Sequence, residues 1–216
     1  MKFDAVLFDC DGVLVDSEAI TCGVLRDMLD ERGWALTLQQ CMDIFVGSAV
    51  TDKRSDIEQH TAQPLTHEWL MSFRERRNAA LVADIHAIPN IHAAVKALHQ
   101  ATAGRIACAS GADRFKVEMM LAQVGLADYF AGKVFSGHEM PRSKPHPDVY
   151  LAAAAHLRVD PARCAVVEDT STGVRAGVSA GATVFAYAPA GGTQALLEAG
   201  AHQVFGDMAA LPGLLC

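Results

Sequence analysis

The sequence lacks several features that would place the protein in a specialised class. No apolar run reaches the roughly 20 residues that a membrane-spanning helix needs. Asp4 and Asp9 interrupt the apolar residues near the N-terminus, which predicts that no secretory signal lies there. No internal repeat and no low-complexity linker is present. The sequence therefore predicts a globular protein of the cytoplasm without a membrane segment.

Paired cysteines are also missing. Six cysteines are scattered along the chain without C-x-x-C spacing: Cys10, Cys22, Cys41, Cys108, Cys164 and Cys216. This distribution argues against a disulfide framework and a zinc site, and it favours free thiols in a reducing compartment. Cys10 and Cys108 lie in or beside apolar runs, so we expect them to be small buried side chains.

Basic residues are outnumbered by acidic ones. The chain has 18 Lys and Arg against 25 Asp and Glu, a formal net charge of -7. This balance argues against a general nucleic-acid binder, which needs a basic face. A phosphorylated small molecule stays possible, because one local pocket can be positive on an acidic protein. The 216 residues, 51% of them hydrophobic, suffice for one domain carrying an insertion.

From Ile85 onward, apolar runs alternate with helical patterns. The strand-like runs cover 105–109, 133–135, 164–167 and 183–186, in addition to 5–8 near the start, and the helical patterns cover 91–100, 113–124, 146–157 and 173–180. Such alternation predicts an α/β fold, with a Rossmann-like, mostly parallel sheet sandwiched by helices. In the helix over 146–157, Pro147 is acceptable in the first turn.

An inserted all-helical subdomain is predicted after the first strand. Apolar residues recur at helical spacing from about Ala19 to Val82, and no strong strand signal appears there. This segment is therefore predicted to be a helical subdomain.

Two aspartates one residue apart follow the first strand-like run. Asp9 and Asp11 are followed at once by Gly12, and this pattern alone is also typical of an ordinary turn. Two neighbouring carboxylates repel each other unless a cation or a shared proton offsets their charge. The pair therefore suggests a site for a hard metal ion, for which Mg²⁺ is the natural candidate.

Further polar groups follow later strands or occupy loops near them. The full set is Asp9, Asp11, Ser110, Lys144, Glu168 and Asp169. Parallel strands bring their carboxyl ends to one edge of a sheet, so these groups can converge. Each suits phosphoryl transfer: a carboxylate as nucleophile, a second acid for proton transfer, a lysine to offset phosphate charge and an acid pair for a metal. Taken singly, the serine and the lysine are more often structural.

These segments together resemble the haloacid dehalogenase superfamily, in the branch of small phosphatases with a helical cap after the first strand. The resemblance covers essentially the whole chain. It rests on residues 9–18, 109–111, 144–147 and 167–170, and on the small-residue segments 173–177 and 180–182.

The resemblance implies a role for each candidate residue. Asp9 would be the nucleophile, and Asp11 would be the general acid/base. Ser110 and Gly111 would hold the phosphoryl group, and Lys144 would pair with it. The substrate would be a small phosphorylated molecule, and the protein would act as a monomer or weak homodimer.

The resemblance also implies a Mg²⁺ site. Asp9 and Asp169 would be ligands, Asp11 would bind through its backbone carbonyl, and Glu168 would be a ligand or a neighbour of the ligands. The resemblance further implies an α/β core of residues 1–16 and 84–216 and a helical cap at 17–83. This cap would close over the core and exclude water.

The choice within the superfamily depends on a few residues. Dehalogenases lack the second aspartate, so Asp11 favours phosphate chemistry. Sugar-phosphate mutases of the β-phosphoglucomutase type carry a cap histidine where we align Thr21, and a cap arginine where this chain reads Ser48-Ala49-Val50-Thr51. The mutase stays the alternative to a phosphatase of sugar or sugar-acid phosphates, and residues 135–137 resemble 6-phosphogluconate phosphatases.

The helical segment also contains three arginines close together, Arg74, Arg76 and Arg77. One of them, with Arg77 as our candidate, could offer the substrate a cation.

Overall fold

The computed structural model describes residues 2–215 and divides the chain into two compact units. The first unit contains the chain up to Asp16 together with the chain from His86 onward, and we call it the core unit. The second unit, Ser17–Ile85, is called the helical unit.

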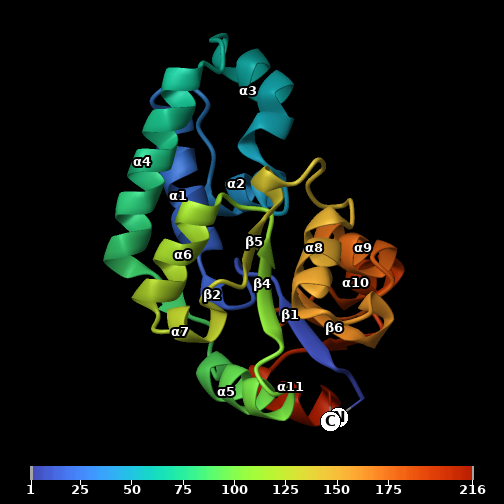
Figure 1. Ribbon diagram of the computed structural model, residues 1–216. Coiled ribbons are helices and arrows are strands. Elements are labelled where there is room, and N and C mark those ends of the chain that lie inside the picture. The colour runs from blue at the N-terminus through green and yellow to red at the C-terminus, as the bar shows by residue number, and fades with distance from the viewer. Residues whose placement is uncertain (1, 216) are drawn as a thin grey trace. The chain divides into compact units, whose positions relative to one another are not determined.

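The core unit is built on a six-stranded sheet with the order β5-β4-β1-β6-β7-β8 (Figure 1). Its strands are β1 (Ala5–Phe8), β4 (Ile106–Ser110), β5 (Val134–Ser136), β6 (Cys164–Glu168), β7 (Thr183–Tyr187) and β8 (Gln203–Phe205). All five pairings are parallel. A separate antiparallel ribbon of β2 (Val15–Asp16) and β3 (His86–Ala87) lies where the chain leaves and re-enters this unit.

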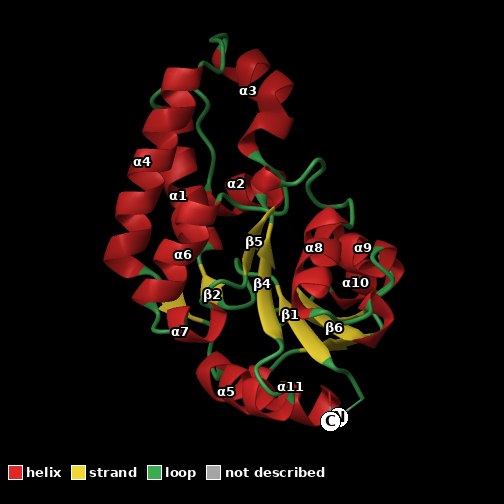
Figure 2. Cartoon of the chain, viewed as in Figure 1, coloured by secondary structure: helices red, strands yellow, loops and turns green. Residues whose placement is uncertain are grey.

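Helices cover both faces of this sheet (Figure 2). They are α5 (Ile91–Ala101), α6 (Arg114–Gln123), α7 (Ala127–Phe130), α8 (Asp148–Leu157), α9 (Ser171–Ser179), α10 (Thr193–Glu198) and α11 (Leu211–Leu215), with the 3₁₀ helices η2 (Gly137–Glu139), η3 (Pro161–Arg163) and η4 (Met208–Ala210). Strands β1, β4 and β6 are buried at every position, as a parallel sheet covered on both faces requires. The predicted α/β class with a mostly parallel sheet is therefore confirmed.

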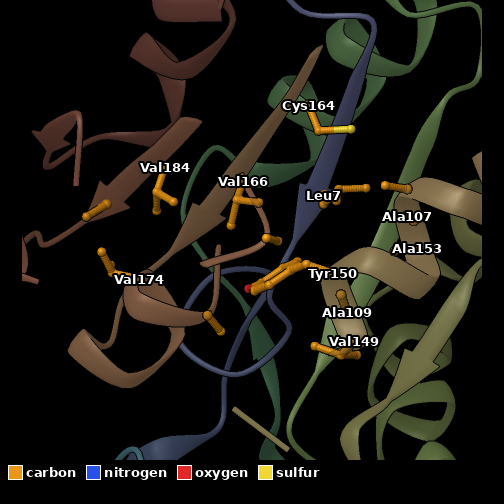
Figure 3. Packing of buried hydrophobic residues seen from close by; sticks show 14 of the residues in the cluster. Leu7, Ala107, Ala109, Val149, Tyr150, Ala153, Cys164, Val166, Val174 and Val184 are labelled. Carbon is orange, nitrogen blue, oxygen red and sulfur yellow. The ribbon is translucent and has the colours of Figure 1, made fainter. Parts of the chain in front are cut away.

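The packing on the two faces follows from the alternation of side chains along each strand. Leu7 and Val166 belong to one buried cluster with Tyr150 of α8 (Figure 3). The next residue, Phe8, faces the opposite layer, where its ring meets that of Phe130 edge-on at 6.0 Å between centroids. Both faces of the central strand are thus filled, which holds its carboxyl end in place.

The helical unit contains only helices among its described residues. They are α1 (Glu18–Asp30), α2 (Leu38–Phe45), η1 (Val50–Lys53), α3 (Arg54–Thr61) and α4 (His67–Asp84). Thr37 and Thr66 cap α2 and α4, because each hydroxyl accepts a hydrogen bond from a backbone N–H three residues later. Leu25, Met28 and Leu29 of α1 belong to a buried cluster of this unit.

Several short elements escaped the sequence analysis. Strand β8, the β2–β3 ribbon and helices α7, α10 and α11 are each six residues long or less, which is too short for a period to show. One expectation was wrong in detail: Pro147 precedes α8 as its cap residue and does not lie in the first turn.

The five described cysteines are free and buried, while Cys216 lies outside the described residues. A hydrogen bond with Cys108, together with burial, raises the pKa of the Cys10 thiol. A protonated buried thiol is unreactive, so Cys10 acts as a small apolar group. Within residues 2–215, no helix combines the length and the apolar character of a membrane span.

Candidate active site

Three of the predicted residues lie at one edge of the sheet because their strands end together. Strand β1 lies between β4 and β6, and the three strands are parallel. Asp9 directly follows β1, and its backbone N–H donates a hydrogen bond to the carbonyl of Val167 at 2.9 Å. Ser110 is the last residue of β4, and Glu168 is the last residue of β6. Open α/β sheets bind their ligands at this edge.

Lys144 joins two of these strand ends through its ammonium group. Its Nζ donates to Asp9 Oδ1 at 2.6 Å and to Glu168 Oε1 at 2.5 Å, and it lies 4.9 Å from the ring centroid of Tyr150. Burial by itself lowers the pKa of Lys144, but the charges of Asp9 and Glu168 outweigh burial and raise it well above its ordinary value. The lysine therefore keeps its positive charge at the centre of the site.

The contacts of Glu168 show how this lysine is held. Glu168 is fully buried, and its Oε1 accepts from the Tyr150 hydroxyl at 2.6 Å as well as from Lys144. Its Oε2 accepts from the backbone N–H groups of Asp169 and Thr170, at 3.1 and 3.3 Å, and from the Thr170 hydroxyl at 3.2 Å. Both oxygens are thus engaged, which suits Glu168 to holding Lys144.

Two glycines leave the space that the strand-end acids occupy. A Cβ at Gly12 would overlap the carboxylate of Asp169, and the positive φ of 75° is a second reason for glycine there. A Cβ at Gly173 would overlap the carboxylate of Glu168. Gly12 and Gly173 are therefore explained by the acids that they approach.

Asp11 has a partner that the sequence analysis missed. Lys116 Nζ donates to Asp11 Oδ1 at 2.5 Å, and only 7% of the lysine side chain is exposed. One signal was available: Lys116 lies on the buried side of α6 with Val117, Met120 and Leu121. A lysine at a core position of a helix is rarely buried unless it is paired.

The predicted phosphate-binding loop lies beside the loop that carries Lys144. Ser110 is buried, and its Oγ accepts a hydrogen bond from the backbone N–H of Ala112 at 3.0 Å. A Cβ at Gly111 would lie 3.8 Å from Ser143 Oγ. Ser110 and Gly111 thus neighbour the residue before Lys144.

Arg77 belongs to the helical unit, whereas the strand-end cluster belongs to the core unit. It is buried, and its Nε and Nη2 donate to Asn78 Oδ1 at 3.1 and 2.8 Å. Its guanidinium also lies 5.8 Å from the ring centroid of Phe73. These contacts lie within the helical unit, and the role of Arg77 as a cation for the substrate stays a prediction.

The charges of the core cluster leave room for a cation. Asp9, Glu168 and Asp169 each offer an oxygen, and these oxygens lie within 4.8 Å of one another. With Asp11 there are four carboxylates against two ammonium groups, Lys116 and Lys144, an excess of two negative charges when all are ionised. Oxygen donors with this excess fit a hard divalent cation such as Mg²⁺.

The pKa of Asp9 is raised because its carboxyl group is buried beside other carboxylates. Burial, helped by the charges of Glu168 and Asp11, raises this pKa to about 7, although the positive charge of Lys144 opposes the shift. Without a cation, the folded protein therefore favours a protonated Asp9 below about pH 7.

This raised pKa predicts how the stability of the metal-free protein depends on pH. The folded state binds more protons than the unfolded state between the ordinary value of 3.8 and about 7, so the free energy of unfolding falls as pH rises through that window. Asn resembles the protonated carboxyl group. We expect the melting temperature of D9N to exceed that of wild type by a few degrees at about pH 8 and to equal it at about pH 4. In a protein of this size, each kcal/mol of stability shifts the melting temperature by roughly 2–4 °C.

Thermal melts in EDTA, from about pH 4 to about pH 8, would measure the difference in melting temperature between D9N and wild type. D4N is a matched control at an exposed aspartate, whose pKa is lowered by its hydrogen bond to Arg163. Its effect should be small and of opposite sign, because stability from a lowered pKa is lost as pH falls. A D9N advantage that does not change with pH would contradict the burial of Asp9 as the cause.

Comparison with known proteins identifies the family. The family model of haloacid dehalogenase-like hydrolases matches residues 3–181. The chain is 31% identical to hexitol phosphatase B of Escherichia coli (strain K12), over 82% of this chain and 79% of that protein. It is 28% identical to the 6-phosphogluconate phosphatase of the same strain, over 85% and 82%.

A solved structure extends the match to nearly the whole chain. The HAD family hydrolase from Deinococcus radiodurans R1, with bound phosphate and sodium, is 33% identical and has a TM-score of 0.80, covering 99% of this chain and 97% of its own. The chain therefore belongs to the haloacid dehalogenase-like hydrolases, and its named relatives make it an enzyme of the phosphatase type.

Proposed function

We propose that the protein is a Mg²⁺-dependent phosphatase of small phosphorylated metabolites, acting through an aspartyl-phosphate on Asp9. One observation carries the proposal: the buried ammonium of Lys144 contacts Asp9 at 2.6 Å, at the sheet edge where Asp169 also offers an oxygen. This arrangement combines a nucleophile, a fixed positive charge and an oxygen-rich cation site, the groups that phosphoryl transfer needs.

In the first step, a carboxylate oxygen of Asp9 attacks phosphorus, and the bond from phosphorus to the leaving oxygen breaks. Asp11 donates a proton to that oxygen, so that an alcohol leaves. Lys144 offsets the charge of the phosphoryl group. Ser110 and Gly111 hold the phosphoryl oxygens with hydroxyl and backbone N–H groups.

In the second step, Asp11 accepts a proton from a water molecule whose oxygen attacks phosphorus. The bond between phosphorus and Asp9 breaks, inorganic phosphate leaves, and the Asp9 carboxylate is restored. Asp11 then holds the proton that the next leaving group needs, so the cycle balances.

The metal would be held by the carboxylates of Asp9 and Asp169 and by the backbone carbonyl of Asp11. Bound Mg²⁺ supplies positive charge to the phosphoryl oxygens. The carboxylate oxygens of Glu168 are of the type that binds Mg²⁺. Its carboxylate already accepts five hydrogen bonds, which favours a role in holding Lys144. Four carboxylates against two ammonium groups support a divalent ion.

Sugar and sugar-acid phosphates are the proposed substrates. The matched relatives include a 6-phosphogluconate phosphatase and a hexitol phosphatase, and the similar solved structure holds phosphate. We assign the choice among these substrates to a cap formed by residues 17–83. The buried free cysteines support work in a reducing compartment, the cytoplasm.

Phosphate release from a panel of esters tests the proposal. We expect turnover of 6-phosphogluconate, fructose 1-phosphate or a hexitol phosphate with Mg²⁺, and its loss in EDTA. Incubation with β-glucose 1-phosphate separates the mutase alternative, since a mutase forms glucose 6-phosphate without releasing phosphate. Absence of phosphate release from every ester with Mg²⁺ would reject the phosphatase.

A further inference from the structure

The ion pair between Lys116 and Asp11 joins positions 105 residues apart in the sequence. Lys116 lies in the first turn of α6, it is 6% exposed, and its Nζ lies 2.5 Å from Asp11 Oδ1. The sequence resemblance implies a role for Asp11, whereas Lys116 has no role in the proposed reaction. The pair therefore needs an explanation of its own.

Stability alone explains this pair poorly. Removing an ammonium group from water costs free energy that one ion pair often fails to recover. Replacing a buried ion pair by apolar side chains of similar volume therefore often leaves the stability of the fold unchanged or increases it. Val117, Met120 and Leu121 show that the buried side of α6 accepts apolar residues. The presence of a buried lysine here, paired with Asp11, points to a role at the Asp11 carboxylate.

The backbone beneath Lys116 is fixed from two directions. Asp113 caps α6, because its Oδ1 accepts a hydrogen bond from the Lys116 backbone N–H at 2.9 Å. The carbonyl of Ala112 accepts from the Ser136 hydroxyl at 2.6 Å, which ties the turn before α6 to strand β5. The ammonium of Lys116 therefore approaches Asp11 from a rigid support, as accurate placement requires.

We propose that Lys116 is a positioning residue that fixes the orientation of the Asp11 carboxylate for proton transfer. This inference rests on the proposed function, in which Asp11 protonates the leaving oxygen and later activates water. Asp11 lies in the loop after β1, and rotation of its side chain would move the carboxylate away from the leaving oxygen. A displacement of about 1 Å at a reacting group can cost on the order of 10²-fold in rate.

The test compares two leaving groups in the first turnover. 6-Phosphogluconate loses an alcohol that needs a proton, whereas p-nitrophenyl phosphate loses a phenolate that does not. We expect K116M to slow the first turnover of 6-phosphogluconate by about 10–100-fold. The burst of p-nitrophenolate should stay close to the wild-type rate. K116R should restore part of the loss, because it keeps a positive charge near Asp11.

A double-mutant cycle with D11N provides the second readout. If Lys116 acts through Asp11, then adding K116M to D11N should lower turnover no further. K133M is the matched control, because Lys133 is partly buried and its Nζ donates to the carbonyl of Gly104 at 3.1 Å. Both residues precede their strands, β5 and β4, at the end opposite to the strand-end acids. We expect K133M to leave both esters at the wild-type rate.

The outcomes separate the two proposals. A wild-type protein that hydrolyses no ester of the panel would reject the proposed function, and the role of Lys116 with it. If wild type prefers another alkyl phosphate of that panel, this ester replaces 6-phosphogluconate in the comparison. An active wild type with a K116M variant that slows both esters equally, or a loss that adds to that of D11N, would overturn only the positioning role. If K116M does not fold, the same comparison is made with K116R, which should slow 6-phosphogluconate selectively.

Discussion

Replacing Asp9 by Asn should abolish phosphatase turnover while leaving the fold intact. Asn has the shape of the protonated carboxyl group that the buried site favours, so the packing at the end of β1 is kept. Its amide cannot attack phosphorus as a carboxylate does. We expect phosphate release to fall by at least about 10⁴-fold, the range found when a covalent nucleophile is removed.

The control for this prediction lies at the other end of the same strand. Asp4 precedes β1 and pairs with Arg163 at the surface, so D4N should keep wild-type turnover and lose little stability. Retention of more than a few per cent of activity by D9N would show that another group attacks phosphorus.

Replacing Lys144 by Met should cost both activity and stability. In K144M, Asp9 and Glu168 would face each other without the ammonium that now contacts both. Removing one partner of a buried ionic cluster typically costs about 3–5 kcal/mol in the free energy of unfolding. Turnover should fall on the order of 10³-fold, because the positive charge beside the phosphoryl group is lost.

Denaturant melts and phosphate release would measure both effects. The double variant D9N/K144M should recover part of the lost stability, since one of the two facing carboxylates is then neutral. K133M again serves as the lysine control. Equal stability of K144M and wild type in EDTA would contradict the ion cluster around Lys144.

Much of the core unit could be predicted because local patterns and topology agree there. The apolar runs before Asp9 and Glu168 are long enough to identify buried parallel strands, and the order of strands and helices places both ends at one edge. The strand-end acids follow from this placement. The short strand β8 and the β2–β3 ribbon carry no comparable pattern, since a few residues cannot show a period.

The partners of the predicted residues were harder to predict than the residues themselves. Lys116 and Tyr150 lie on helices, where the sequence shows only a polar group on an otherwise apolar face. Which acid each one meets depends on how its helix packs on the sheet. The two oxygens of Glu168 illustrate this, because no spacing indicates that the Tyr150 hydroxyl and the Thr170 loop would engage both.

The covalent intermediate gives the most direct test of the central claim. Wild-type protein would be mixed with 6-phosphogluconate and Mg²⁺, quenched with acid during turnover and reduced with borohydride, which converts an aspartyl-phosphate to homoserine. Peptide mass mapping should then find homoserine at Asp9 in wild type, and none in D9N or without substrate. Rapid turnover with unmodified Asp9, or homoserine at another acid such as Asp11 or Asp169, would contradict the assignment of Asp9 as the nucleophile.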